Sequence, residues 1–292
     1  MQRMSDGKGF GAAVVDALLD PIAVHLARRR RPLLVGLWGL QGSGKSTLAD
    51  QLVRASNARG IDALAISIDD FYFGRRERLR LARHVHPLLA TRGVPGTHDL
   101  PLLRATLAAL ARAAPEEPAR VPRFDKGRDT RQPRSRWRSL TRPPRLIVLE
   151  GWCVGVPPQG EAALVRPCND LERDEDPDRR WRRHVDRQLA RHYAPLWRRL
   201  DLLVALRAPS FAVVARWRGE QESALRLRKA PQAMDEAALA RFIAHYERLS
   251  RHALRVLPPR ADRVVSLDAR RRVRSISAPA RLDPSRARTA RC

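Results

Sequence analysis

Short apolar segments that alternate with helical ones predict an α/β fold, in which helices flank a doubly wound and mostly parallel sheet. The segments are apolar at nearly every position, as in strands that are covered on both faces. A glycine-rich turn joins the first of them to a helix, which is the local order that a nucleotide-binding sheet requires.

Five strands and six helices are expected along the chain. The expected strands are Leu33–Trp38, Ala63–Ile68, Leu146–Leu149, Leu202–Leu206 and Arg263–Leu267. The expected helices are Ala12–Arg29, Lys45–Arg59, Leu100–Ala113, Trp181–Arg199, Phe211–Arg228 and Asp235–Leu254. The last helix carries an i, i+3, i+4, i+7 stripe that predicts a core-facing side. Its members are Leu239, Phe242, Ile243, Tyr246 and Leu249.

The turn after the first strand matches the pattern G-x-x-x-x-G-K-[ST] from Gly39 to Ser46. Its glycines allow backbone N–H groups to point at a polyphosphate, and the following helix N-terminus adds a favourable dipole. Lys45 is expected to reach the β- and γ-phosphates, and the Ser46 hydroxyl to ligate Mg²⁺. The pattern therefore predicts a P-loop NTPase that binds ATP through the loop and the helix start. The expected ATP-binding residues are Gly39, Gln41, Gly42, Ser43, Gly44, Lys45, Ser46 and Thr47.

Two aspartates, Asp69 and Asp70, follow the second strand, and Tyr72 stands beside them. Ligands of open α/β sheets bind at the carboxyl ends of the strands, so these side chains should face the same crevice as the loop. Asp69 is expected to orient and deprotonate an attacking hydroxyl, with Asp70 and Tyr72 near the acceptor. Alternatively, Asp70 caps the next segment.

The third strand runs into Glu150, Gly151 and Trp152. Four aliphatic residues followed by an acid resemble a Walker B segment. Its acid belongs near Mg²⁺, directly or through water. Ser46 and Glu150 are thus the expected metal ligands.

A turn rich in Gly and Pro between the second and third strands is a candidate acceptor-binding loop, and it carries Arg92, His98 and Asp99. Asp99 also suits the N-cap of the helix that begins at Leu100. Further along, Lys126 supplies another cation. The loop and the segment around Lys126 are expected to be insertions in the α/β fold, one that binds the acceptor and one that covers it as a lid.

Arg216 and Arg218 lie on the helix after the fourth strand. Arginine forks there would stabilise charge on a transferring phosphoryl group, so both are expected to be catalytic. The alternative is i, i+4 pairing of Arg218 with Glu222, which is worth only ~0.3–0.5 kcal/mol.

The formal net charge of +26 would suit a nucleic-acid-binding protein. However, four of the 57 basic residues are lysines, and the arginines spread along the whole chain. Since no aromatic-interleaved basic stripe or nucleic-acid module accompanies the charge, we expect no specific nucleic-acid partner. Non-specific attraction to polyanions is expected at low salt.

Length, cysteine content and hydropathy indicate the number of domains, the redox compartment and the relation to membranes. A chain of 292 residues suits one α/β domain with insertions, and a monomer is expected. Cys153, Cys168 and Cys292 form no C-x-x-C pair, which favours a reducing compartment. No apolar run approaches the ~20 residues that span a bilayer, so a cytoplasmic protein without a membrane partner is expected.

Residues 1–269 are expected to form one P-loop kinase domain. Within it, 120–144 should be a polar loop insertion, and the charge run Glu172–Arg180 a solvated surface. Residues 270–292 are expected to form a basic, disordered tail. His84 and His86 are expected to be solvated or to face the substrate, since no partner ligands stand at metal spacing nearby.

The motifs in order resemble the D-glycerate 3-kinase family, a branch of the P-loop kinases related to uridine kinase, phosphoribulokinase and bacterial pantothenate kinase. The resemblance runs from Leu33 to Asp268. The specific parts are R-G-V-P-G-T-H-D and W-R-G-E-Q-E, because the Walker elements are shared far more widely. The remaining parts are G-L-Q-G-S-G-K-S-T-L-A, S-I-D-D-F-Y, P-R-F-D-K and E-G-W.

The resemblance implies ATP-dependent phosphorylation of the 3-hydroxyl of D-glycerate, a small hydroxy acid. It points to Asp69 as the base and puts Glu150 at the metal, with His98 and Asp99 near the acceptor. A carboxylate acceptor needs a cation, which Arg92 or Lys126 could supply. One departure bears on the acceptor: Gly127–Arg131 is shorter and more basic than the family's glycine-rich stretch.

Two alternatives remain open at this stage. The first is a kinase of the same class with another acceptor, such as a nucleoside or a pantothenate-like acid. The second is a regulatory or nucleic-acid-associated ATPase that uses the basic surface. A base candidate and an acceptor loop speak against the second alternative.

Overall fold

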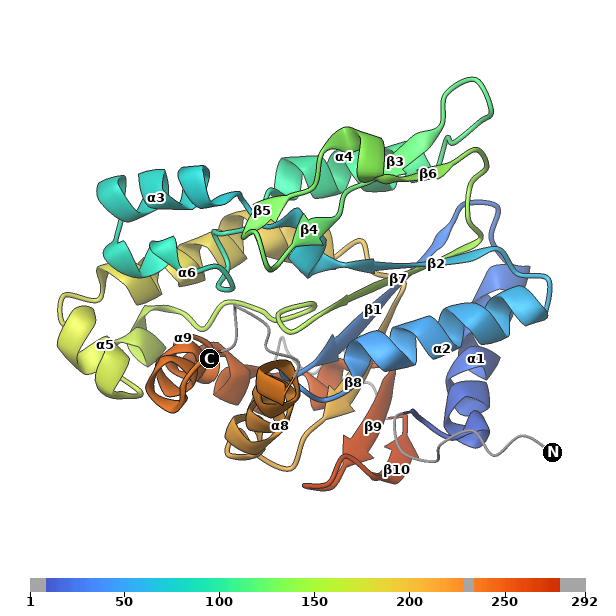
Figure 1. Cartoon of the computed structure of the whole chain (residues 1–292). Coiled ribbons are helices and arrows are strands. Elements are labelled where there is room, and N and C mark those ends of the chain that lie inside the picture. The colour runs from blue at the N-terminus through green and yellow to red at the C-terminus, as the bar shows by residue number, and fades with distance from the viewer. Residues whose placement is uncertain (1–8, 228–233, 279–292) are drawn as a thin grey trace, which may run out of the picture.

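The central sheet has six strands in the order β10-β9-β8-β1-β7-β2, in a computed structural model that describes residues 9–227 and 234–278 (Figure 1). Neighbouring strands from β9 to β2 run parallel, and β10 runs antiparallel to β9. Each expected strand is present with its bounds shifted by two residues at most. The strands are β1 Leu33–Gly39, β2 Ala63–Ser67, β7 Leu146–Gly151, β8 Leu202–Arg207, β9 Arg263–Leu267 and β10 Val273–Ser277.

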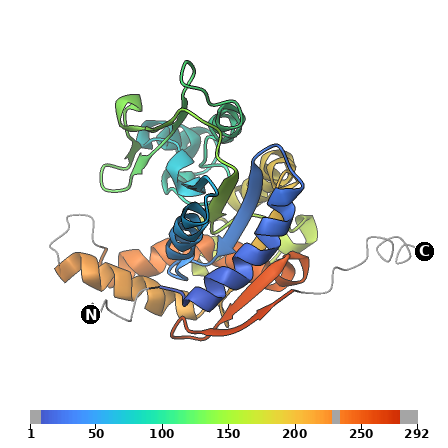
Figure 2. The same ribbon diagram turned by 90° about the vertical axis from the view of Figure 1, so that its right-hand side faces the viewer.

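Helices flank this sheet, and α1 and α2 lie side by side (Figure 2). No helix among the described residues is both long and apolar enough to cross a membrane. The helices are α1 Ala12–Ala27, α2 Lys45–Ala58, α3 Arg75–His84, α4 Leu100–Leu110, α5 Asp170–Glu175, α6 Arg180–Gln188, α7 Ala194–Trp197, α8 Val213–Leu227 and α9 Glu236–Val256.

Two neighbouring interior strands of the sheet, β1 and β7, are buried along their whole length. A strand covered on both faces cannot alternate apolar and polar residues, which explains their continuous apolar runs. Trp38, Leu37 and Val148 are fully buried there and join the main core. The structure confirms the predicted α/β class.

The helix expected over 181–199 is interrupted. A π-helical turn, Leu189–Tyr193, separates α6 from α7. Pro195 lies at the start of α7 and has no N–H to donate to a carbonyl of the preceding turn, which favours a break there. Helix α3 was not expected, because its sequence is dominated by arginine and shows no clear apolar stripe.

The polar stretch 120–144 is not a plain loop. It contributes two short antiparallel pairs that lie, together with α3 and α4, above the β2–β7 edge of the sheet (Figure 1). The pairs join β3 Ala119–Val121 to β6 Arg138–Leu140, and β4 Phe124–Asp125 to β5 Thr130–Arg131. Backbone pairing therefore gives this arginine-rich segment a fixed shape without a core of its own.

The boundary expected at residue 269 is wrong. Residues 273–277 form β10, which pairs with β9 and places Val273 and Ile276 against the core. The side chains of Arg272 and Arg274 pair with Asp268 in the turn before it. Strand pairing thus includes residues that composition alone assigned to a disordered tail, and 279–292 lie outside the described residues.

Register brings the ends of three strands together. Glu150, near the end of β7, lies opposite Leu37 of β1 on one side and Ser67 of β2 on the other. Since all three strands run the same way, the segments that follow them meet at one edge of the sheet.

Ending the chain at residue 269 instead of 278 should lower its free energy of unfolding by about 1–3 kcal/mol, because two partly buried aliphatic residues and a strand pairing are lost. Urea unfolding of the 1–278 and 1–269 chains measures the difference. Identical midpoints would show that β10 adds nothing to the fold.

Candidate active site

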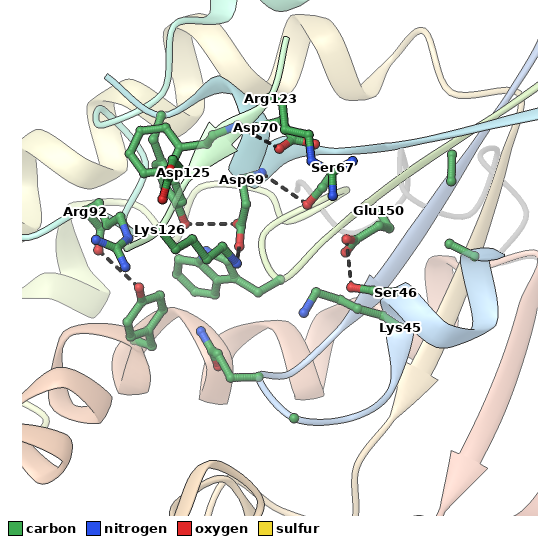
Figure 3. A pocket seen from close by; sticks show the side chains of 18 of the residues that line it. Lys45, Ser46, Ser67, Asp69, Asp70, Arg92, Arg123, Asp125, Lys126 and Glu150 are labelled. Atoms are coloured by element: carbon green, nitrogen blue, oxygen red, sulfur yellow. Dashed lines mark hydrogen bonds and ion pairs between the residues drawn. The ribbon is translucent and has the colours of Figure 1, made fainter. Parts of the chain in front are cut away.

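A pocket of about 760 Å³ opens at the carboxyl ends of β1, β2 and β7 (Figure 3). Its lining is mostly polar and charged, as suits a site for charged substrates. It brings together the majority of the residues expected from the sequence. These are Gln41, Gly42, Lys45, Ser46, Asp69, Asp70, Tyr72, Arg92, Lys126, Glu150 and Arg218.

The loop between β1 and α2 has the backbone that a phosphate cradle needs. Gly44, the N-cap of α2, has φ of 91°, in the left-handed region that residues with side chains rarely adopt. Lys45 follows it and makes no ion pair with the described residues. An unpaired ammonium at a helix N-terminus fits a polyphosphate. The other expected residues do not line the pocket: Gly39 ends β1, Ser43 and Gly44 lie in the turn, and Thr47 lies in the first turn of α2.

Ser46 and Glu150 meet across the loop. The Ser46 hydroxyl donates a hydrogen bond of 2.9 Å to Oε1 of Glu150, whose side chain is buried. The other carboxylate oxygen, Oε2, is buried without a hydrogen-bond partner among the described residues. A buried, half-satisfied carboxylate beside a hydroxyl is an oxygen donor set that suits Mg²⁺. The residues therefore fit the metal that the sequence pattern implies.

Asp69 lies across the pocket from Lys45 (Figure 3). Its Oδ1 accepts a hydrogen bond of 3.0 Å from the Tyr72 hydroxyl, and its Oδ2 accepts one of 2.7 Å from Nζ of Lys126. Burial acts to raise the pKa of Asp69, but the ammonium groups of Lys126 and Lys45 outweigh it and hold that pKa below its usual value. Asp69 is therefore ionised at neutral pH.

The neighbouring Asp70 has a different environment. Its Oδ1 accepts a hydrogen bond of 3.0 Å from the backbone N–H of Phe124. This bond joins the end of β2 to residues 119–140, the segment that holds strands β3 to β6 and is called the arm below. Burial, reinforced by the charge of Asp69, raises the pKa of Asp70 to about 6 despite that bond. Asp70 thus anchors the arm, while Asp69 carries the permanent negative charge.

A hairpin formed by β4 and β5 borders the side of the pocket that contains Asp69, and Lys126 lies in its turn. The hairpin is fixed by Asp129, whose carboxylate forms ion pairs with both Arg78 and Arg92. Arg78 is almost fully buried and also donates to the backbone carbonyl groups of Phe73 and Ala90. These contacts hold Arg92 and the hairpin in place around the pocket.

The loop that carries Arg92 is clamped by two aromatic residues. The Tyr246 hydroxyl donates a hydrogen bond of 3.1 Å to the carbonyl of Arg92, and Nε1 of Trp152 donates one of 3.1 Å to that of Gly93. A Cβ at Gly93, where φ is 140°, would lie 2.0 Å from the hydroxyl oxygen of Tyr246. Only glycine allows this approach.

His98 and Asp99 do not line the pocket. His98 is buried, stacks on the ring of Tyr72 at 4.4 Å and shares a hydrogen bond of 2.7 Å with the Tyr193 hydroxyl. Burial lowers the pKa of His98 to about 4, so its ring is neutral. Asp99 caps α4 through the Leu102 N–H and pairs with Arg131. His98 therefore packs against Tyr72 of the pocket without lining the pocket itself. For Asp99 the capping alternative is confirmed.

The two arginines of α8 also differ from expectation. Arg216 is exposed and lies outside the pocket lining. Arg218 does line the pocket, but it forms the i, i+4 ion pair with Glu222 and lies over the ring of Phe242. Residues at i and i+2 lie about half a turn apart around a helix, so two arginines at this spacing could not both face one phosphoryl group.

Other pocket residues were not identified from the sequence. Arg123 lines the pocket close to Asp70 and makes no ion pair with the described residues. Phe242 and Tyr246 were assigned to the core by the stripe of the last helix, yet both also line the pocket. A helical stripe shows which side is buried but not whether it is buried against protein or against a ligand.

The charge run expected to be solvated is instead partly buried. Glu172 and Asp176 are at most 1% exposed. The Asp176 carboxylate accepts hydrogen bonds from the backbone N–H groups of Trp181 and Arg182 and pairs with the buried Arg182 guanidinium at 2.9 Å. Glu172 pairs with Arg248 in the same way. Charges can be buried here because each has a partner.

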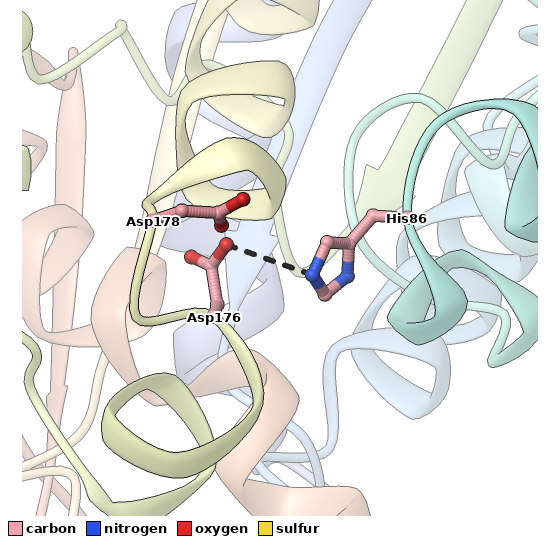
Figure 4. Close-up of side chains that lie close together, drawn as sticks. All are labelled: His86, Asp176 and Asp178. Carbon is pink, nitrogen blue, oxygen red and sulfur yellow. Dashed lines mark ion pairs between the residues drawn. The ribbon is translucent and has the colours of Figure 1, made fainter.

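His86, Asp176 and Asp178 bring three ligand-type atoms within 4.8 Å of one another (Figure 4). Nδ1 of His86 accepts a hydrogen bond from the Leu88 N–H, and its Nε2 is 3.7 Å from Oδ1 of Asp176. Asp178 accepts from the backbone N–H of Arg180. With these groups already engaged, the cluster fits helix capping rather than a metal site.

Two curated proteins are similar to the chain over most of its length, although no protein-family model matches it. A protein of Schizosaccharomyces pombe named "Uncharacterized kinase mug58" is 33% identical over 241 residues, which are 80% of this chain and 85% of the relative. The chloroplastic D-glycerate 3-kinase of Arabidopsis thaliana is 30% identical over 240 residues, or 78% of this chain. The match spans 50% of that plant relative.

Solved structures confirm the fold. D-glycerate 3-kinase from Cryptococcus neoformans has a TM-score of 0.74 at 24% identity, with 92% of this chain and 100% of that chain covered. A putative fructose transport system kinase from Silicibacter has a TM-score of 0.54 at 22% identity, with coverages of 82% and 92%. Both are kinases by name, and at these identities the likeness shows the shared architecture.

Asp176→Ala should destabilise the protein by about 3–5 kcal/mol, because it leaves the buried Arg182 guanidinium without its partner and α6 without its cap. Asp178→Ala, an exposed neighbour, is the matched control and should change stability by less than about 0.5 kcal/mol. Urea unfolding measures both. Equal effects of the two variants would contradict the buried pair.

Asp70 should make stability depend on pH in a defined direction. Its pKa in the folded protein, about 6, exceeds the ordinary 3.8, so its contribution is fully present below pH 3.8 and lost as pH rises through 6. Asp70→Asn should therefore stabilise the protein by about 1–3 kcal/mol above pH 6 and leave it unchanged below pH 4. Asp69→Asn, where the native pKa is lowered, should show the opposite sign above pH 4. Urea unfolding across this range tests both, and a pH-independent difference for Asp70→Asn would contradict the burial argument.

Proposed function

The chain belongs to the family of P-loop kinases that includes D-glycerate 3-kinase, and we propose that it phosphorylates the 3-hydroxyl of D-glycerate with ATP. The observation that carries the proposal is the ionised carboxylate of Asp69 across the pocket from Lys45, with further cations around the acceptor side. The carboxylate can receive the proton of an acceptor hydroxyl, and the cations can bind the carboxylate of an acidic acceptor.

The donor side of the pocket supports binding of a nucleoside triphosphate. Lys45 has no ionic partner among the described residues and can neutralise phosphate charge, while the backbone around Gly44 and the N-terminus of α2 offer N–H groups. Charge neutralisation by such fixed groups stabilises a phosphoryl group in transfer, because little covalent chemistry is left for the protein to perform.

Ser46 and Glu150 would hold Mg²⁺. Oε2 of Glu150 has no hydrogen-bond partner in the described part of the chain and lies on a carboxylate that contacts the Ser46 hydroxyl, which supports this assignment. When bound, the ion would neutralise charge on the phosphate oxygens. Glu150 keeps its carboxylate in place through its backbone pairing between β1 and β2.

The acceptor side supports a small acid. Arg92, Arg123 and Lys126 contribute three cations to this part of the pocket, and Tyr72 and Asp69 contribute hydrogen-bonding oxygens. Arg92 is held rigidly through Asp129 and Tyr246, which suits a group that has to orient a substrate carboxylate. Bidentate guanidinium–carboxylate contacts give both affinity and orientation.

In this proposal Asp69 orients the acceptor hydroxyl and receives its proton as the oxygen attacks the γ-phosphorus. The bond between that phosphorus and the β–γ bridging oxygen breaks, and ADP leaves. Lys45 neutralises the charge that remains on the leaving phosphates. The Tyr72 hydroxyl holds Asp69 in position through its 3.0 Å hydrogen bond.

An ADP-release assay with a panel of acceptors tests this function. D-glycerate should give turnover above the acceptor-free background, whereas a nucleoside, pantothenate and polynucleotide should not. Asp69→Asn should keep ATP affinity while kcat for D-glycerate falls by ~10²-fold or more, a typical general-base contribution. Turnover with another acceptor alone would overturn the glycerate assignment, and near-normal turnover of the variant would remove Asp69 from the mechanism.

A further inference from the structure

Both carboxylate oxygens of the base candidate are already engaged. Tyr72 donates to Oδ1 of Asp69, and Lys126 donates to Oδ2 at 2.7 Å. Each of these oxygens keeps a second lone pair, but an ammonium at that distance opposes protonation of the oxygen it contacts. In this state Asp69 is a poor proton acceptor.

Two cations hold Asp69 in its charged form, and each comes from a different side of the pocket. Lys45 belongs to the phosphate loop, and Lys126 belongs to the β4–β5 hairpin. The triphosphate of the donor attracts Lys45. Lys126 therefore is the cation that an acceptor can displace. The buried His98 also faces Asp69, but its ring is neutral.

The side chain of Lys126 can move from Asp69 to another anion while its backbone stays fixed. Its side chain is 61% exposed, although the hairpin that carries it is fixed by the ion pairs of Asp129 with Arg78 and Arg92. The four-carbon stem of lysine can therefore swing while the backbone stays in place. Arg92 and Lys126 both line the acceptor side, so an acid bound there presents its carboxylate to both.

We propose that Lys126 couples the charge of the acceptor to the base: the substrate carboxylate draws the ammonium away from Asp69 and frees Oδ2 for the hydroxyl proton. The inference rests on the proposed function. As the proton moves to Oδ2, the acceptor oxygen bonds to the γ-phosphorus, the bond to the bridging oxygen breaks, and ADP leaves with that electron pair.

The coupling gives selectivity for acids over neutral alcohols and water. An acidic acceptor exchanges one ammonium–carboxylate pair for another, so the number of ion pairs is unchanged. A neutral acceptor can free Asp69 only by breaking the pair without replacement. Lys126 thus acts as a specificity-determining residue that also suppresses ATP hydrolysis in the absence of the acceptor.

The test is Lys126→Met, assayed by ADP release with D-glycerate, with glycerol and without acceptor. Compared with the wild type, the variant should turn over glycerol and hydrolyse ATP without acceptor ~10-fold faster or more, while turnover of D-glycerate falls. A gain of activity on neutral acceptors cannot arise from a misfolded hairpin or from the mere loss of a carboxylate anchor.

Two further variants serve as controls. Lys126→Arg keeps a cation at the position and should retain the preference for the acid. Arg128→Met removes a charge from the same exposed hairpin, but Arg128 does not line the pocket, so this variant should behave as the wild type.

The outcomes separate this inference from the proposed function. If Lys126→Met loses turnover of D-glycerate without gaining any on glycerol or water, Lys126 is only a substrate anchor and the coupling is overturned. If the wild type ignores D-glycerate but Lys126→Met still hydrolyses ATP faster without acceptor, the coupling stands and the acceptor assignment fails.

Discussion

The parallel pairing of β7 between β1 and β2 is the constraint on which the site depends. It fixes Glu150 opposite Leu37 and Ser67, so the phosphate loop, the metal-ligand candidate and the strand-end aspartates share one edge. Buried backbone hydrogen bonds and a continuous apolar core hold this register, since a shift by one residue would turn every side chain to the other face. The chemistry is therefore positioned by the interior of the sheet.

Features that depend on local pattern could be predicted from the sequence. The five strands, the phosphate loop and the positions of Lys45, Ser46, Asp69 and Glu150 each follow from a short motif in a defined context. The acceptor side was harder. There Arg92, Asp129 and Tyr246 meet from segments far apart in the chain, and single-sequence patterns carry no record of such meetings.

Predictions from the sequence were wrong for charged residues, because the same residue type occurs both in solvent and in buried or paired positions. Asp176 and Glu172 lie in a run that composition assigns to solvent, yet arginines from other elements allow their burial. Conversely, Arg216 belongs to a motif that favours a catalytic role but points away from the pocket, because helix geometry gives residues two apart different directions. Arginine thus also serves the interior, where Arg78 and Arg182 are buried with carboxylate partners.

The contact between Tyr246 and Gly93 ties α9 to the loop bearing Arg92, across more than 150 positions of chain. The β4–β5 hairpin is held by the ion pairs of Asp129 and by Phe124 of β4, whose buried ring packs edge-on against Tyr72. Redesign of acceptor scope can therefore exchange the hairpin if Phe124 and Asp129 are kept, whereas any replacement of the glycine-containing loop has to alter α9 in the same step. Selection for new substrates would meet the same asymmetry.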